Sequence, residues 1–340
     1  MMTDGSTTAN MIGIGNVVID RSATLSRDVI LALGYPEKAT SLIDDDVAVM
    51  ISQKFSWDNS SAGGSVGNTM ATVAALTKIF GGTTVASSIE FHGMASHDHA
   101  AMVFEDSFAE HGGKARLYKI DKSHTGQCFC LIDETSGERT MLANLGSNIY
   151  FHTKYLDGDY LAKTHLLFLE GYLFDNHDSK TAFTNIVKNK TLEQKIALTL
   201  SDHFCVNRHG TDFLALIKQG IDIVFANEAE IIALTNSDDF EAALLVAKDL
   251  APLVIITRSE KGVMILEKEK SPLTISAKKN IKVIDATGAG DQLAGGFLFG
   301  YHYGWSHEKS ARLGCHLAAT IIGQVGARLA IDKNMVSDFL

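Results

Sequence analysis

The segment Asp285-Ala286-Thr287-Gly288-Ala289-Gly290-Asp291 places a glycine turn and a carboxylate between two apolar stretches. Upstream, residues 281–284 predict a short strand, and downstream the apolar run 293–305 predicts a buried helix. The turn is therefore expected at a helix N-terminus, where backbone N–H groups lack intrahelical partners and the helix dipole is positive. Such a site stabilises a phosphoryl group in transit, and a carboxylate at Asp291 is suited to deprotonate an attacking hydroxyl. The alternative is an ordinary helix start capped by Thr287 or Asp291.

The same segment, followed by Gly295, Gly296 and Phe297, resembles the C-terminal signature of the ribokinase-like (PfkB) family of sugar and nucleoside kinases. Ala286 departs from the signature, because the family commonly has Thr at that position. The resemblance implies an α/β fold, namely a three-layer α/β/α domain with a mostly parallel central sheet and a small β-sheet lid. It further implies ATP as phosphoryl donor and Mg²⁺ as cofactor, and it leaves a role for K⁺ open.

Composition sets limits on the class of protein. The chain has 340 residues, of which 46% are hydrophobic and 21% charged, as is typical of a globular protein. A net charge of −10 without any basic block argues against nucleic acid as a partner, and no run of about 18 apolar residues predicts a membrane span. No export signal is evident, and the cysteines form no Cys-x-x-Cys pair. Reduced thiols and a cytoplasmic location are therefore expected for Cys128, Cys130, Cys205 and Cys315.

Apolar strand-like runs alternate with amphipathic stretches along the chain, which is typical of a parallel sheet covered by helices on both faces. The predicted strands are residues 11–18, 83–87, 166–169, 196–200, 223–226, 254–257 and 262–266. Helices are predicted over residues 66–80 and 239–250. The kinase domain is expected to span residues 11–340, after a flexible N-terminus at residues 1–10.

Two insertions interrupt this alternation, at about residues 21–60 and 113–148. The second contains a predicted hairpin, in which residues 125–133 and 138–143 flank the turn Thr135-Ser136-Gly137. The insertions predict a small second sheet that acts as a lid, because phosphoryl transfer to a sugar hydroxyl must exclude water as a competing acceptor. A homodimer through an exposed lid face is a further expectation.

Two common nucleotide-binding motifs are missing from the sequence. Gly13-Ile14-Gly15 follows the first predicted strand, but Val18 stands where a dinucleotide fingerprint needs a third small residue. No Walker A sequence occurs either. ATP would therefore be bound through another fold.

The N-terminal half carries the substrate-binding candidates. Asp20 follows the first strand, and the resemblance implies that it accepts hydrogen bonds from two sugar hydroxyls. The segment 61–68 resembles the family's N-terminal signature, Gly-Gly-x-x-x-Asn, and implies contacts to a ribose from Gly63, Gly64, Ser65 and Asn68. The structural alternatives are a turn aspartate at Asp20 and a helix N-cap at Ser65. Adenosine kinases typically carry Ser at this last position, whereas ribokinases carry Lys.

The C-terminal half carries the nucleotide-binding candidates. Asn227 and Glu230 match the family's Asn-x-x-Glu element, which implies that they bind Mg²⁺ through water; the alternative is that acidic residues simply favour a helix N-terminus. The loop 257–262 resembles the Thr-x-Gly-x-x-Gly phosphate loop, although Ser259 replaces the first Gly, and Arg258 is either a phosphate clamp or a surface residue. The implied ATP contacts are Asn227, Thr257, Ser259, Gly262, Thr287 and His316.

The closest resemblance within the family is to adenosine kinases, and it rests on the hairpin segments 125–128 and 139–145. The segment that begins with Glu170 follows another predicted strand and is suited to contact a base. Arg139 and Glu170 are accordingly implied in substrate binding. The expected reaction is transfer of the γ-phosphoryl group of ATP to a primary ribosyl hydroxyl, most simply adenosine to AMP. Asp291 would act as base, with backbone amides of Gly288, Ala289 and Gly290 facing the phosphoryl group. The alternatives are a kinase for a free sugar or keto-deoxy acid, and a catalytically silent binding protein.

Overall fold

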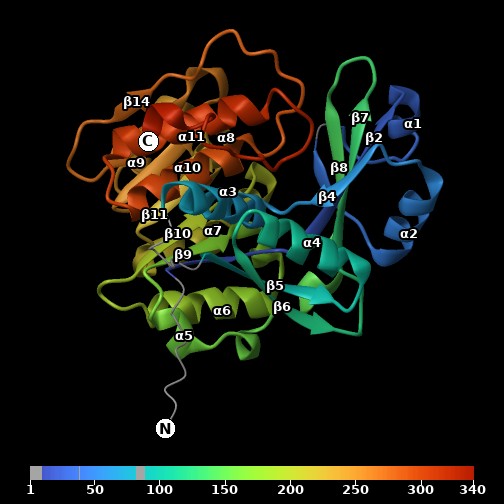
Figure 1. Cartoon of the computed structure of the whole chain (residues 1–340), viewed down its shortest axis with the longest axis horizontal. Coiled ribbons are helices and arrows are strands. Elements are labelled where there is room, and N and C mark those ends of the chain that lie inside the picture. Colours follow the sequence, from blue (N-terminus) through green and yellow to red (C-terminus); the bar gives the residue numbers. More distant parts are fainter. Residues whose placement is uncertain (1–9, 38, 82–88) are drawn as a thin grey trace.

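The computed structural model describes residues 10–37, 39–81 and 89–340 (Figure 1). The strand predicted over residues 83–87 lies outside these ranges, as does nearly all of the N-terminal segment 1–10. Among the described residues, no helix combines the length and the apolar character needed to cross a membrane.

Nine strands of the described residues form the main sheet, in the order β14-β13-β12-β11-β10-β9-β1-β5-β6. All neighbouring strands from β12 to β6 are parallel. The two antiparallel pairs are β12 with β13 and β13 with β14. The parallel strands end at one edge of the sheet, where ligands bind in open α/β folds. The bounds are β1 Met11–Ile14, β5 Ile89–Ser96, β6 Lys114–Ile120, β9 Leu166–Glu170, β10 Lys195–Thr199, β11 Ile223–Asn227, β12 Leu253–Thr257, β13 Val263–Glu267 and β14 Leu273–Ile275.

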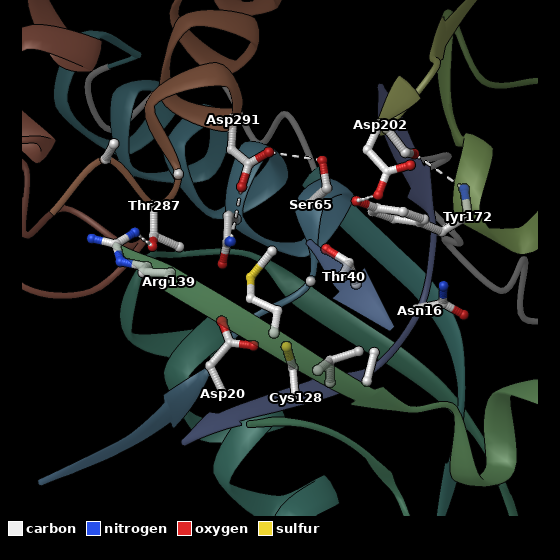
Figure 2. A pocket seen from close by; sticks show the side chains of 18 of the residues that line it. Asn16, Asp20, Thr40, Ser65, Cys128, Arg139, Tyr172, Asp202, Thr287 and Asp291 are labelled. Atoms are coloured by element: carbon white, nitrogen blue, oxygen red, sulfur yellow. Dashed lines mark hydrogen bonds between the residues drawn. The ribbon is translucent and has the colours of Figure 1, made fainter. Parts of the chain in front are cut away.

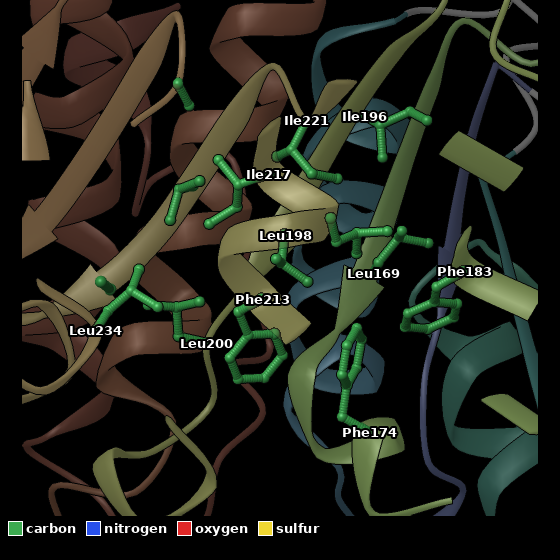
Figure 3. Packing of buried hydrophobic residues seen from close by; sticks show 14 of the residues in the cluster. Leu169, Phe174, Phe183, Ile196, Leu198, Leu200, Phe213, Ile217, Ile221 and Leu234 are labelled. Atoms are coloured by element: carbon green, nitrogen blue, oxygen red, sulfur yellow. The ribbon is translucent and has the colours of Figure 1, made fainter. Parts of the chain in front are cut away.

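Helices cover both faces of this sheet, because its strands present apolar side chains to either side. In β10, Ile196 and Leu198 pack with α5 to α9 (Figure 3), whereas Ala197 faces the cluster formed with α3, α4, α10 and α11. The bounds are α3 Ser65–Phe80, α4 His99–Glu110, α5 Gly158–Ala162, α6 His177–Lys188, α7 His203–Gly220, α8 Glu228–Thr235, α9 Phe240–Ala247, α10 Ala289–His302 and α11 His307–Ile321. Short 3₁₀ helices are η2 Gly146–Tyr150, η3 Thr153–Tyr155, η4 Gly171–Asp175, η5 Ser259–Lys261 and η6 Ser337–Phe339.

A second sheet, in the order β3-β8-β7-β2-β4, stands beside the main domain (Figure 1). The predicted hairpin is confirmed, with antiparallel β7 and β8 joined by a turn in which Gly137 has φ +71°. Along β7, Phe129 and Leu131 pack against the two helices of the insertion, and Cys128 points to the opposite face. The bounds are β2 Val18–Leu25, α1 Arg27–Leu31, β3 Thr40–Leu42, α2 Asp45–Lys54, β4 Asn59–Ala62, β7 Gly126–Asp133 and β8 Arg139–Asn144.

Two expectations from the sequence need correction. β6 pairs with β5, so residues 114–120 belong to the main sheet and not to the small one. The strand predicted at residues 281–284 is absent; the N–H groups of Ile284 and Asp285 donate instead to the carbonyl oxygen of Ile322, which follows α11. Val283 and Ile284 are apolar yet more than half exposed, and both line a cavity.

Candidate active site

The glycine turn lies at the N-terminus of α10, as the sequence predicts. Gly288 precedes the helix with φ +78°, and a Cβ there would come within 2.7 Å of the Ala327 carbonyl oxygen, so only glycine fits. The Asp285 carboxylate accepts the Thr287 N–H at 2.6 Å and the Gly326 N–H at 3.0 Å, which fixes the turn. The first-turn amides of Gly290 and Asp291 have no intrahelical acceptor, whereas the Ala289 N–H already donates to the Ala286 carbonyl oxygen at 3.3 Å.

Asp291 is held from two sides by the start of α3 (Figure 2). One oxygen accepts the Ser65 hydroxyl at 2.7 Å, and the other accepts the Asn68 side-chain amide at 2.9 Å. Burial raises the pKa of Asp291 to about 6, while these two hydrogen bonds and the nearby Arg328 act in the opposite direction. A carboxylate with a pKa just below neutrality is well matched to general-base catalysis.

Two cavities meet at this carboxylate. Cavity 1, of about 720 Å³, lies between the small sheet and the strand ends of the main sheet, and cavity 2, of about 900 Å³, lies beside α10, α11 and the ends of β11 and β12. The residues common to both linings are Ser65, Ser201, Val283, Ala286, Gly288 and Asp291. The two cavities can therefore bring two reactants together at Asp291.

Asp20 faces cavity 1 from β2, as its place after the first strand predicts. Within the described part of the chain, no hydrogen bond reaches its carboxylate, and burial raises its pKa to about 7. Gly63 lies directly against it, since a Cβ at Gly63 would come within 2.1 Å of an Asp20 oxygen. The carboxylate is therefore free to accept hydrogen bonds from a ligand.

Ser65 is not the N-cap of α3, which was the structural alternative for this residue. Gly64, with φ +81°, is the N-cap residue, so Ser65 is the first helical residue and its hydroxyl is directed to Asp291 instead. Glu170 accepts the Val66 N–H at 3.1 Å with one oxygen and the Asn16 amide at 3.0 Å with the other. Glu170 is 1% exposed and lines cavity 1. Its carboxylate therefore supports the start of α3 from within the protein.

Arg139 links the small sheet to the glycine turn. From β8 it donates to the Thr287 hydroxyl (Figure 2). It also forms an ion pair with Asp285. Its Nε–H is buried and has no hydrogen-bond partner among the described residues. Arg139 thus lines cavity 1, and its Nε–H is available to donate to a ligand.

Asn227 and Glu230 both line cavity 2, and they form a capping box at the start of α8. The Glu230 oxygens accept from the Asn227 backbone and side-chain amides, and burial raises the pKa of Glu230 to about 7. Among the described residues, no cluster of three or more His, Cys, Asp or Glu could hold a metal directly. The pair nevertheless fits a Mg²⁺ ion bound through water, because each carboxylate oxygen keeps a second lone pair and Mg²⁺ usually retains several waters.

The loop between β12 and β13 also borders cavity 2 through Thr257, Ser259 and Gly262. Ser259 has φ +49°, which is the strained conformation expected where the family has glycine. At Gly262 a Cβ would come within 2.0 Å of the Ile275 carbonyl oxygen. Arg258 is not a free phosphate clamp, because it pairs with Glu228 at 3.0 Å and stacks on the Phe240 ring at 3.9 Å.

His316 is not placed in either cavity. Its ring contacts the Met335 carbonyl oxygen at 2.8 Å and packs against Phe339. Because α11 turns this side chain away from cavity 2, the residues next along the helix, Ala318 and Ala319, line the cavity instead. The expected ATP contact of His316 is therefore wrong.

Arg328 is the functional candidate that motif reading missed. It lies behind Asn68 and donates its Nε–H to the Asn68 side-chain oxygen at 3.0 Å. The only signal in the sequence is its position directly after Gly326-Ala327, because no local pattern joins it to Asn68, which lies 260 residues away.

Comparison with known proteins decides the family. Residues 43–334 match the model of the pfkB family of carbohydrate kinases. The chain belongs to this family. It is consequently a phosphotransferase with an alcohol group as acceptor and ATP as the implied phosphoryl donor.

The relatives include nucleoside and sugar kinases. Adenosine kinase of Saccharomyces cerevisiae is 25% identical over 96% of this chain and 98% of that protein. Cytidine kinase of Thermococcus kodakarensis is 34% identical over a shorter match, which covers 42% of this chain and 50% of that protein. Among solved structures, adenosine kinase of Sinorhizobium meliloti has a TM-score of 0.88 at 29% identity, covering 98% of this chain and 99% of that one. A probable sugar kinase of Rhizobium etli has a TM-score of 0.89 at 28% identity, covering 98% of both chains.

Proposed function

We propose that this pfkB-family kinase transfers the γ-phosphoryl group of ATP to the 5′-hydroxyl of a nucleoside, with adenosine as the preferred substrate. The position of Asp291 between two cavities carries the proposal, because a phosphoryl donor and a hydroxyl acceptor can meet there. The near full-length similarity to adenosine kinases and the serine at position 65 support adenosine.

Cavity 1 suits a nucleoside. Asp20 has open acceptor positions for the two ribose hydroxyls, and the lack of a side chain at Gly63 makes room for its carboxylate. A base would lie between the Tyr172 ring and apolar side chains; the Tyr172 hydroxyl is fixed by a 2.9 Å hydrogen bond to Asp202. The apolar lining consists of Val18, Leu42, Met141, Leu145, Val283 and Ile284. Burial by a base also accounts for the exposed Val283 and Ile284.

The chemistry follows from the position of α10. Asp291 takes the proton of the 5′-hydroxyl as that oxygen attacks the γ-phosphorus, while the bond to the β-phosphate oxygen breaks and ADP leaves. The amides of Gly290 and Asp291 in the first turn of α10 would donate to the oxygens of the transferred group, and the positive end of the helix dipole would offset the charge of these oxygens. Two hydrogen bonds to Asp291, from Ser65 and Asn68, hold the base in position before the substrate binds.

Cavity 2 is the proposed ATP site. Thr257 and Gly262 would meet the phosphates, and Ala318 and Ala319 would border the adenine. Asn227 and Glu230 would hold Mg²⁺ through water, and the ion would neutralise charge on the phosphates. We further infer that the small sheet acts as a lid over cavity 1, since Arg139 already joins it to the glycine turn.

A panel of acceptors tests the proposed function. ADP release from Mg-ATP is measured with adenosine, guanosine, inosine, cytidine, ribose, fructose and a 2-keto-3-deoxy sugar acid at equal concentrations. We expect the highest kcat/KM with adenosine. A free sugar as best substrate would establish the sugar-kinase alternative, which the Rhizobium etli structure favours. ADP release no higher than the rate without acceptor, for every compound, would contradict a kinase and indicate a binding protein.

The variant Gly290→Ala tests the role of Gly290 at the phosphoryl site without disturbing the stability of the fold. No heavy atom lies within 4 Å of a Cβ at Gly290, and alanine is favoured over glycine in a helix by about 1 kcal/mol, so Tm should stay equal or rise. The methyl group would occupy the space of the phosphoryl oxygens, and we expect kcat to fall roughly 10²-fold, comparable to the loss of one oxyanion donor. The control is Gly158→Ala in α5, which also meets no atom within 4 Å. Wild-type kcat in Gly290→Ala would place the phosphoryl group elsewhere.

A further inference from the structure

Arg328 is a buried cation behind the two signature motifs. Its Nε–H donates to Asn68 at 3.0 Å, Nη1 to the Ser107 hydroxyl at 2.9 Å and Nη2 to the Gly63 carbonyl at 3.3 Å. The guanidinium lies over the Phe104 ring, 4.9 Å from its centroid. These contacts hold it in a single orientation although it lines neither cavity.

The fold makes room for this side chain and fixes the turn that carries it. A Cβ at Gly67 in α3 would come within 3.2 Å of the Arg328 Nη2 and 3.0 Å of Phe104, so glycine allows the close approach. The turn before Arg328 is bound to both ends of the glycine motif. The Gly326 N–H donates to Asp285 at 3.0 Å, and the Gln292 side-chain amide donates to the Ala327 carbonyl at 2.8 Å. Arg328 thus connects the C-terminal signature to the N-terminal one.

The contact with Asn68 decides which way its amide faces. Because a guanidinium can only donate, the Asn68 oxygen must face Arg328, and the Asn68 nitrogen must then face Asp291. The reverse orientation would set two donors against each other and leave Asp291 with one hydrogen bond fewer. The orientation of the base therefore depends on Arg328 through Asn68.

Charge acts in the same direction. The charged groups around Asp291 and Asp20 are these two carboxylates themselves, Glu170, Asp285 with its partner Arg139, and Arg328. The thiols of Cys128 and Cys130 also lie near Asp20, and burial raises their pKa values. Burial lowers the pKa of Arg328 to about 10, which leaves it cationic at neutral pH. Its charge opposes the burial that raises the pKa values of Asp20 and Asp291.

We propose that Arg328 is a positioning residue of the phosphoryl-transfer site, which orients the Asn68 amide toward Asp291 and supplies a positive charge that favours the ionised forms of Asp291 and Asp20. The inference rests on the proposed function for its kinetic consequence, but the charge coupling exists in the free protein. Both consequences can be measured separately.

The kinetic test compares Arg328→Met, Arg328→Lys and the wild type. Without the cation the pKa of Asp291 rises, so the acid limb of the kcat/KM profile should move up by about one pH unit, and the deficit should be larger at pH 6 than at pH 9. Arg328→Lys keeps the charge and should return the acid limb of the kcat/KM profile most of the way to its wild-type position. Its kcat should stay low, because lysine cannot reproduce all three hydrogen bonds. Affinity for ADP should be unchanged, since Arg328 does not line cavity 2. An equal loss at every pH in Arg328→Met would indicate a merely structural role and overturn the proposal.

A second measurement needs no substrate and decides the charge coupling even if the nucleoside assignment fails. The pKa values of Asp20 and Asp291 are raised in the folded protein from the ordinary value of 3.8, so the folded state binds more protons and stability falls as pH rises toward 7. Tm is measured over a series of pH values for the wild type and Arg328→Met. In the variant, the fall of Tm with rising pH should extend to higher pH than in the wild type. The matched control is Arg312→Met, which removes an exposed cation paired with Glu308 on α11 and should leave this pH range unchanged. Identical pH dependence in the two variants would overturn the proposal.

Discussion

Asp291→Asn is expected to lower kcat by roughly 10²- to 10⁴-fold, which is the usual effect of losing a general base. Asparagine keeps the size of the side chain, and its oxygen can still accept from Ser65 or Asn68, so the protein should fold. It cannot take a proton from the acceptor hydroxyl. The measurement is the rate of ADP formation at saturating Mg-ATP and adenosine.

Affinity for ADP is the companion measurement for this variant. It should change little, because most of the lining of cavity 2 is untouched. The control variant is Asp238→Asn, an exposed aspartate that precedes the N-cap of α9 and should behave as the wild type. A turnover in Asp291→Asn equal to that of the wild type would exclude Asp291 as the base.

Asp20→Asn is expected to lower kcat/KM for adenosine by roughly 10- to 10²-fold. Hydrogen bonds to a charged group contribute about 1.5–3 kcal/mol, and the Asp20 carboxylate is positioned to accept two ribose hydroxyls. Most of the change should appear in KM, because Asp20 does not touch the reacting oxygen. The measurement is a steady-state comparison at saturating Mg-ATP.

A substrate without the diol isolates this contact. 2′,3′-Dideoxyadenosine should be a poor substrate of the wild type, and Asp20→Asn should cost little more with it, because the interaction is already gone. If the substitution lowered kcat/KM as much with the dideoxynucleoside as with adenosine, Asp20 would not bind the ribose hydroxyls.

Much of the fold follows from local patterns. Short apolar runs such as 166–169 and 223–226 are buried strands because both faces of a parallel sheet are covered, and the alternation in 125–133 reflects a strand with one face on α1 and α2. The glycine motif was also predictable, since Gly288 occupies a left-handed conformation against Ala327 that only glycine tolerates. In these cases the local sequence pattern is enough to predict the element.

Contacts between distant segments were not predictable in the same way. The Ser65 hydroxyl was expected to contact a ribose, with a cap of its own helix as the alternative, but it bonds to a carboxylate 226 residues away. Arg328 gains its role only from the approach of α3, and His316 faces away from cavity 2 because Met335 and Phe339 pack against it. The apolar residues 283 and 284 suggested a strand, since nothing in the sequence distinguishes a buried strand from a segment that lines a ligand cavity.

The most direct test of the central claim compares adenosine with 5′-deoxyadenosine, which differs only in lacking the proposed acceptor hydroxyl. ADP release and the phosphorylated product are measured with Mg-ATP, the product by mass spectrometry. With adenosine we expect ADP and AMP in equal amounts, and with 5′-deoxyadenosine we expect ADP release no higher than without any acceptor. Equal ADP release with both compounds, or a phosphorylated 5′-deoxyadenosine, would contradict transfer to the 5′-oxygen beside Asp291.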